Sequence, residues 1–134
     1  MLSQPCLHEM QTNWLPNITD QGLDRLISLL EKDSPLLIHG SFTQAMPQGC
    51  LATHVAWNHP ETEHLCNDAG IVWLSRVARV NPSFSRVVQE WDTCREANFE
   101  VRTDLLELLK KERQDREDRV RQPACPQDPQ PCGV

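Results

Sequence analysis

Five side chains that could do chemistry are concentrated between residues 50 and 66. They are two thiols and three imidazoles, the groups that most often bind structural zinc: Cys50, His54, His59, His64 and Cys66. Cys50 and His54 lie four residues apart on a predicted helix, so both can face one zinc ion, and the loop that follows would supply the remaining ligands. The spacing matches no standard zinc finger, because a Cys-x2-Cys pair is missing. The alternative places Cys50 and His54 in the core and leaves His59 and His64 on a solvated loop.

Cys50 and His54 also suggest a second chemistry. Cys50 follows Gly49 at a predicted helix start, where the helix dipole lowers the pKa of a thiol, and His54 lies one turn later as a candidate general base. A base one turn along the same helix usually lies beside the sulfur instead of facing its proton. A metal-dependent or thiol enzyme centred on these two residues is therefore the alternative function.

Two further charged sets are weaker candidates. Glu90 and Asp92 flank Trp91, but positions two apart diverge by about 200° around a helix, so they cannot form a catalytic pair alone. We expect them to form a solvated acidic face. Three arginines form either an anion site or an ordinary surface face: Arg76, Arg79 and Arg86.

Helical periodicity places most of these residues. Apolar side chains spaced three and four apart predict helices over residues 20–33, 50–59, 68–80, 82–94 and 99–122. Asn81 and Pro82 are expected to cap and begin the fourth helix. Residues 36–38 form a short apolar run without a recognisable partner strand. The expected core includes Leu26, Leu30, Leu51, Val55, Leu74, Val77, Phe84, Val88 and Trp91.

These elements predict a mainly α protein, a compact bundle of four or five helices within a helical domain at residues 20–110. Residues 1–19 contain Pro5 and Pro16, so we expect an irregular N-terminal arm there. Residues 111–122 are expected to extend the last helix as a charged, solvated segment. Residues 123–134 are rich in proline and glutamine and are expected to be disordered.

Composition narrows the classes of partner. The net charge is −6, and residues 1–94 carry five Lys and Arg against ten Asp and Glu, which argues against nucleic-acid binding. There is no run of about 20 apolar residues and no export signal, so we expect a soluble, cytoplasmic protein that does not bind a membrane. In a reducing compartment the six cysteines would be thiols or metal ligands.

Several short motifs resemble a group of small uncharacterised bacterial and phage proteins. They are Gly40, the Gly49-Cys50 pair at a helix start, residues 88–92 and the leucine-rich residues 105–109. Members of that group tend to show a Trp-Asn-Asp-type motif, from which Glu90-Trp91-Asp92 departs. The resemblance covers roughly residues 22–110 and implies no activity or cofactor.

Taken together, these patterns favour a non-enzymatic helical adaptor or regulator that binds another protein. The expected contact surface is an acidic or leucine-bearing helical face, because the charged last helix needs something to pack against. The sequence indicates neither the identity of the partner nor the oligomeric state.

Overall fold

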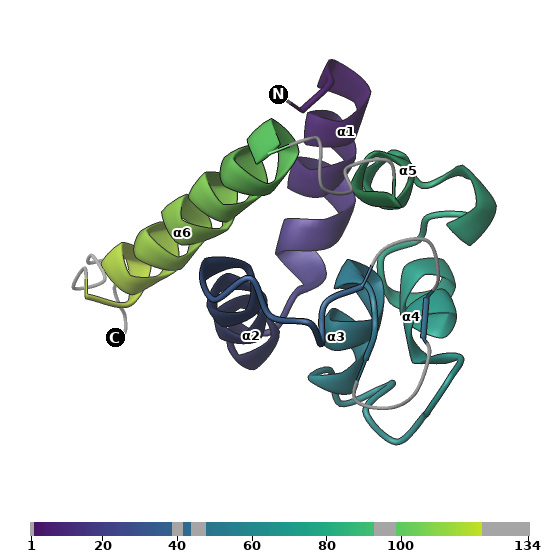
Figure 1. Ribbon diagram of the computed structural model, residues 1–134. Coiled ribbons are helices and arrows are strands. Elements are labelled where there is room, and N and C mark those ends of the chain that lie inside the picture. Colours follow the sequence, from purple (N-terminus) through teal and green to yellow (C-terminus); the bar gives the residue numbers. More distant parts are fainter. Residues whose placement is uncertain (1, 39–41, 44–47, 93–98, 122–134) are drawn as a thin grey trace, which may run out of the picture.

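Figure 1 shows a computed structural model of the chain, which is mainly α-helical, as the sequence predicts. The structure describes residues 2–38, 42–43, 48–92 and 99–121, and every structural statement below concerns these. Within them, short π and 3-10 turns join six α-helices, and the only extended pairing is a pair of isolated bridges at Gly49. The α-helices are α1 (Gln4–Glu9), α2 (Asp20–Glu31), α3 (Leu51–Trp57), α4 (Ala69–Val72), α5 (Arg86–Asp92) and α6 (Phe99–Arg121).

The N-terminal segment is helical, so the expected irregular arm is wrong. Pro5 lies in the first turn of α1, where a backbone N–H has no helical partner to lose, and the Ser3 side chain caps this turn. The helix continues as a π turn, η1 (Met10–Trp14), and then as a 3-10 turn, η2 (Leu15–Asn17). Pro16 lies near the start of η2, where proline is also tolerated. Met10 and Trp14 are at most 1% exposed, so the segment forms part of the core.

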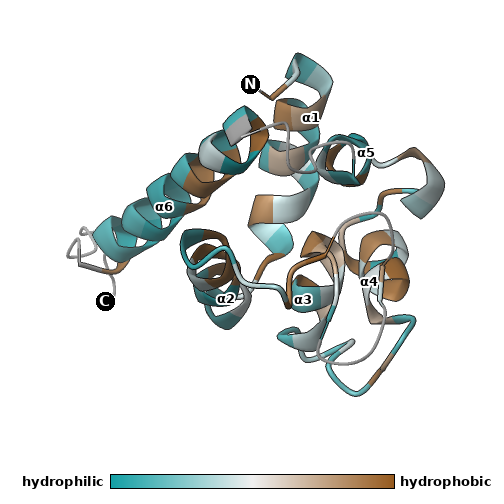
Figure 2. Ribbon diagram, viewed as in Figure 1, coloured by the Kyte–Doolittle hydropathy of each residue, from teal (hydrophilic) through white to brown (hydrophobic). Residues whose placement is uncertain are grey.

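Helices α2 and α6 pack against each other (Figure 1). The ion pairs Lys110–Glu31 and Arg116–Asp20 show that the two helices run in opposite directions. The Thr19 side chain accepts a hydrogen bond from Gly22 N and begins α2 where the sequence predicts. Leucines at helical spacing on α2 face Val101, Leu105 and Leu109 of α6, and all of these apolar side chains are buried. Figure 2 shows the change along α6, from an apolar stripe in its first half to a hydrophilic far end.

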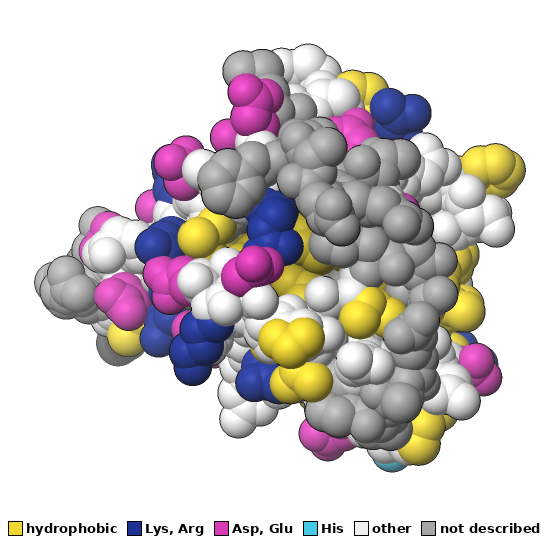
Figure 3. All heavy atoms as spheres, viewed as in Figure 1, with side chains coloured by type: hydrophobic (Ala, Val, Ile, Leu, Met, Phe, Trp, Pro, Cys, Tyr) yellow, Lys and Arg dark blue, Asp and Glu magenta, His cyan; other side chains and the backbone are white. Residues whose placement is uncertain are grey.

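The far half of α6 is less solvated than expected, because it is joined to α2 by ion pairs. Lys110 binds Glu31 at 2.7 Å, Arg113 binds Asp24 at 2.7 Å and Arg116 binds Asp20 at 2.8 Å. Arg102 and Asp33 add a pair at the other end of the interface. Figure 3 shows positive and negative side chains alternating at this end of the molecule. These ion pairs therefore fix how the two helices are aligned along each other.

The apolar run at residues 36–38 finds its partner in Gly49. Gly49 N donates to Leu36 O at 2.9 Å, and Ile38 N donates to Gly49 O at 3.0 Å. The backbone of Gly49 approaches α3 closely, since a Cβ there would lie 2.7 Å from Thr53 Cγ2. Gly49 alone thus pairs with the apolar run, in place of a second strand.

Two local departures from regular helix change which residues between 69 and 92 are buried. A π turn, η3 (Trp73–Val77), follows α4, and its extra residue changes the helical phase, so Val77 is only half-buried and its predicted burial is wrong. The expected fourth helix is divided into a 3-10 turn, η4 (Pro82–Phe84), and α5, with Ser85 extended between them. Phe84 is consequently 71% exposed, and its predicted burial is wrong.

The remaining expected core residues, among them Trp91 and Val88, are buried. Trp14 and Trp73 contact each other edge to face at the centre of the molecule, with ring centroids 5.2 Å apart. Trp91 Nε1 donates to Ile38 O at 2.7 Å. No helix in the described part of the chain is long and apolar enough to span a membrane. Cys94 and the expected disordered tail at residues 123–134 lie outside the described residues.

Candidate functional site

The five candidate zinc ligands are not brought together as a set. Cys50 immediately precedes α3, without a side-chain capping hydrogen bond, and His54 lies within the helix; both are 2% exposed. Cys66 and His64 are exposed on the loop after α3, and His59 is half-buried at the start of that loop. Among the described residues, no group of three or more His, Cys, Asp or Glu side chains is placed to hold a metal ion. Zinc binding therefore stays a prediction that metal analysis of the purified protein would test.

Cys50 and His54 also do not form a thiol and base pair. The Cys50 sulfur contacts Thr53 Oγ1 at 3.8 Å, whereas His54 Nε2 donates to Leu36 O at 2.8 Å. Burial raises the pKa of the Cys50 thiol and so disfavours the reactive thiolate. Burial also lowers the pKa of His54, which keeps the imidazole neutral. The two residues have the surroundings of core side chains, as the alternative interpretation expects.

A polar cluster that the sequence did not reveal joins α1 to α5. Glu9, on α1, accepts hydrogen bonds at the start of α5 from Arg86 N at 2.8 Å and from Ser85 Oγ at 2.5 Å. Glu90, on α5, accepts in return from the backbone N–H and the hydroxyl of Ser3, at the start of α1. Each carboxylate therefore caps the N-terminus of the other helix, where the helix dipole favours negative charge.

The surroundings of this cluster indicate a structural role. Glu9 also accepts from Trp14 Nε1 at 2.8 Å, so its oxygens are engaged by neighbouring groups of the protein itself. Cys6 lies on α1 between the two carboxylates, and burial together with the nearby Glu90 and Glu9 raises the pKa of its thiol to about 12. A thiol with so high a pKa is not a nucleophile near neutral pH.

A groove opens on the surface between the N-terminal helical segment and α6. One part of it is a hollow of about 400 Å³ that α1 and the middle of α6 line. Its apolar residues are the half-buried Leu2, Leu7 and Leu108. The polar residues around them are Gln4, Asp104, Glu107 and Lys111. Leucines from two separate segments thus meet at one surface depression.

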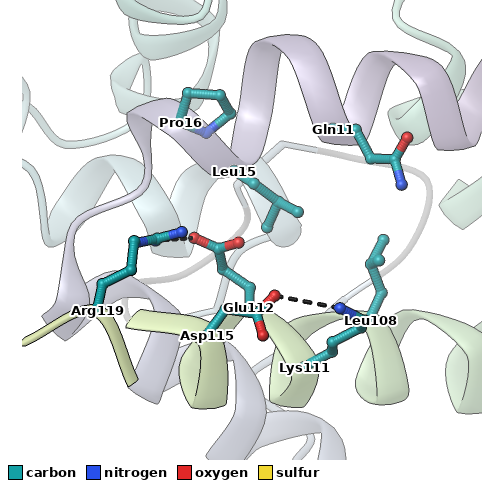
Figure 4. A pocket seen from close by; sticks show the side chains of 8 residues that line it. All are labelled: Gln11, Leu15, Pro16, Leu108, Lys111, Glu112, Asp115 and Arg119. Carbon is teal, nitrogen blue, oxygen red and sulfur yellow. Dashed lines mark hydrogen bonds and ion pairs between the residues drawn. The ribbon is translucent and has the colours of Figure 1, made fainter. Parts of the chain in front are cut away.

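A second hollow of about 430 Å³ continues the groove toward the C-terminal end of α6. The two hollows share Leu108 and Lys111, so they are adjacent. Figure 4 shows Leu15 and Leu108 projecting into the space between the segments, with Pro16 and Gln11 on the N-terminal side. We call the two hollows together the α1–α6 groove. Its floor is made mostly of leucine, and polar groups form its rim.

The rim of the α1–α6 groove carries more negative than positive charge. Its only cations are Lys111 and Arg119, against four carboxylates: Asp104, Glu107, Glu112 and Asp115. Lys111 lies 3.2 Å from Asp115, and Arg119 lies 3.5 Å from Glu112, as the dashed lines in Figure 4 mark. Both cations are therefore already paired, and Glu112 is also paired with Arg116 beside the groove, so the side chains around the groove carry a small excess of negative charge.

One further residue holds the groove in shape. Arg116 lies on α6 beside the groove. Its Nε binds Glu112 at 2.7 Å, and its Nη2 donates to both Leu15 O and Ile18 O, each at 2.8 Å. These bonds fix the turn that carries Leu15 and Pro16 against the helix. Its i, i+4 pairing with Glu112 was readable from the sequence, but the contacts with the N-terminal turn were not.

Comparison with known proteins identifies no relative of this chain. No protein-family model matches it, and neither a curated protein nor a solved structure gives a significant match.

Proposed function

We propose that the protein is a small non-enzymatic binding module whose docking surface is the α1–α6 groove. The observation that carries this proposal is the leucine floor of the groove, which combines half-buried Leu2, Leu7 and Leu108 in one hollow. Grooves of this kind between helices accept the apolar face of a partner helix, whose side chains spaced three and four apart fill the depressions. The enzymatic alternative has less support, because the thiol of Cys50 is buried and its pKa is raised.

The charge of the rim indicates the chemistry of the partner. Four carboxylates against two paired cations favour a ligand that carries Lys or Arg beside its apolar residues. We therefore propose an amphipathic protein segment with a basic flank as the partner. An acidic segment would meet repulsion along the whole rim, so charge selects between otherwise similar helices.

A designed peptide tests this function directly. The probe is an amphipathic peptide of roughly 15 residues, long enough for several helical turns, with leucine on one face and lysine on the other. Its matched partner has glutamate in place of lysine. We expect fluorescence anisotropy of the labelled peptides to show binding of the basic form that is about tenfold or more tighter than that of the acidic form, a difference of one decade in Kd.

Two variants distinguish binding of the peptide in the groove from its nonspecific hydrophobic binding elsewhere. Leu108→Ser removes the leucine shared by both hollows, whereas Ile71→Ser makes the equivalent change at an exposed site on α4. The proposal expects weaker peptide binding for Leu108→Ser and unchanged binding for Ile71→Ser, with both variants folded by circular dichroism. Equal affinities for the two variants, or equal affinities for the two peptides, would contradict it.

A further inference from the structure

A second surface feature complements the α1–α6 groove. Phe84 is 71% exposed on η4, and that turn is rigid because the Asn81 side chain caps it and Pro82 occupies its first position. Figure 1 places the segment between α4 and α5 on the side of the molecule away from α6. A large aromatic side chain held outward on a short rigid turn has little conformational freedom to lose when it is buried in a complex.

The surroundings of Phe84 carry the opposite charge to the groove. Residues 69–89 contain no Asp or Glu, although the chain as a whole has a net charge of −6. The cations of this stretch are Arg76, Arg79 and Arg86, and all three are exposed. Arg79 and Pro82 line one shallow hollow beside η4. Arg86 lies two residues beyond Phe84 and pairs with Glu90 at 3.5 Å. We call Phe84 with Arg79 and Arg86 the Phe84 knob.

We propose that the Phe84 knob of one molecule docks in the α1–α6 groove of a second copy. This inference rests on the proposed function, since it names an occupant for the same groove. The knob has the two properties that the groove selects: an apolar side chain to cover Leu7 and Leu108, and cations to face the exposed carboxylate of Glu107. Knob and groove lie on different sides of the molecule, so one copy cannot satisfy its own groove.

The contact is heterologous, because it joins two different surfaces of identical molecules. Such contacts leave one knob and one groove unoccupied at the ends of each assembly, and they add further copies unless the rotation closes a ring. A single aromatic side chain and its flanking cations make a small interface, so the association is weak and rises with concentration. A partner helix with higher affinity for the groove would dissociate the assembly.

Sedimentation of the full chain tests the contact. We expect the weight-average mass of the wild-type protein to increase between roughly 10 μM and 1 mM, the range of weak complexes. Phe84→Ser and Glu107→Lys each change an exposed side chain, so both variants keep the fold, and each is expected to remain monomeric over that range. Ile71→Ser is the matched control for loss of an exposed apolar side chain and is expected to associate as the wild type does.

Mixing the two monomeric variants gives the sharpest result. Phe84→Ser retains a groove and Glu107→Lys retains a knob, so an equal mixture is expected to form a dimer of one copy of each and nothing larger. A wild type that is monomeric throughout, variants that associate normally, or a mixture that stays monomeric would overturn the proposal. So would a monomeric protein whose Phe84 knob instead binds anionic vesicles or RNA.

The outcomes separate this inference from the proposed function. If the wild type stays monomeric but its groove still binds the basic peptide, self-association is wrong and the binding module stands. If the groove binds neither the peptide nor a second copy, both are wrong. If the basic peptide dissociates the assembly at the concentration that fills the groove, both are supported by one titration.

Discussion

Replacement of Glu9 by alanine should destabilise the protein more than the same replacement of an exposed Asp or Glu. Glu9 is 9% exposed and accepts hydrogen bonds from Trp14 Nε1, Ser85 Oγ and Arg86 N. Its removal leaves the buried indole N–H of Trp14 without an acceptor, which costs about 1–3 kcal/mol. The loss of the charge-assisted bond at the start of α5 adds roughly 1.5–3 kcal/mol. The buried Ser85 hydroxyl still accepts from Val88 N at 3.2 Å, but its O–H also loses its acceptor.

The expected total for Glu9→Ala is therefore a loss of about 2.5–6 kcal/mol in the free energy of unfolding. Glu9→Gln keeps the shape and one carbonyl oxygen, so we expect an intermediate loss of about 2 kcal/mol. Glu61→Ala, at an exposed carboxylate, is the control and should stay within about 0.5 kcal/mol of the wild type. Urea titrations followed by circular dichroism measure all three. A loss for Glu9→Ala no larger than that of the control would refute the capping role of this carboxylate.

Three further predictions follow from single contacts. Burial lowers the pKa of His54 below its ordinary value of about 6.5, so protonation of this imidazole favours the unfolded state. The free energy of unfolding should therefore be fully present above that pH and should fall below it. His54→Gln should flatten this dependence in urea titrations at a series of pH values. Arg116→Ala should cost about 2–4 kcal/mol, because Leu15 O and Ile18 O lose this donor and Glu112 keeps the longer pair with Arg119. Arg119→Ala, at a largely exposed residue, should cost less than about 1 kcal/mol, and equal losses would contradict the network. Gly70→Ala should lower the melting temperature, since the new Cβ would lie 2.9 Å from the backbone nitrogen of Thr53; an unchanged melting temperature would show that the contact relaxes freely.

Periodicity was informative wherever the helix was regular. The leucines of α2 and the stripe formed by Val87, Val88 and Trp91 are buried as their spacing predicts. Periodicity failed where a turn changed the phase. The π turn at Trp73–Val77 leaves Val77 half-buried, and the extended Ser85 moves Phe84 to the surface. The intrinsic helix propensities of these residues do not predict such a change, because tertiary packing determines it.

The N-terminal segment shows how one residue type was misjudged. Proline was read as a helix breaker, yet Pro5 and Pro16 both lie in first turns, where proline is tolerated. The α1–α6 groove depends on this segment, because Leu2, Leu7 and Leu15 come from it. These residues lie roughly 100 positions from Leu108 in the sequence, and no local pattern connects them. The groove could therefore be found only once the fold was known.

The central claim is that the α1–α6 groove is a docking surface, and methyl NMR spectra of the full chain test it most directly. The basic amphipathic peptide is titrated into the protein while the leucine methyl signals are followed. The account predicts that Leu2, Leu7, Leu15 and Leu108 shift together with one affinity, whereas the core leucines Leu23 and Leu51 do not. Shifts that are absent, or that map to another surface while these four signals stay in place, would contradict the account.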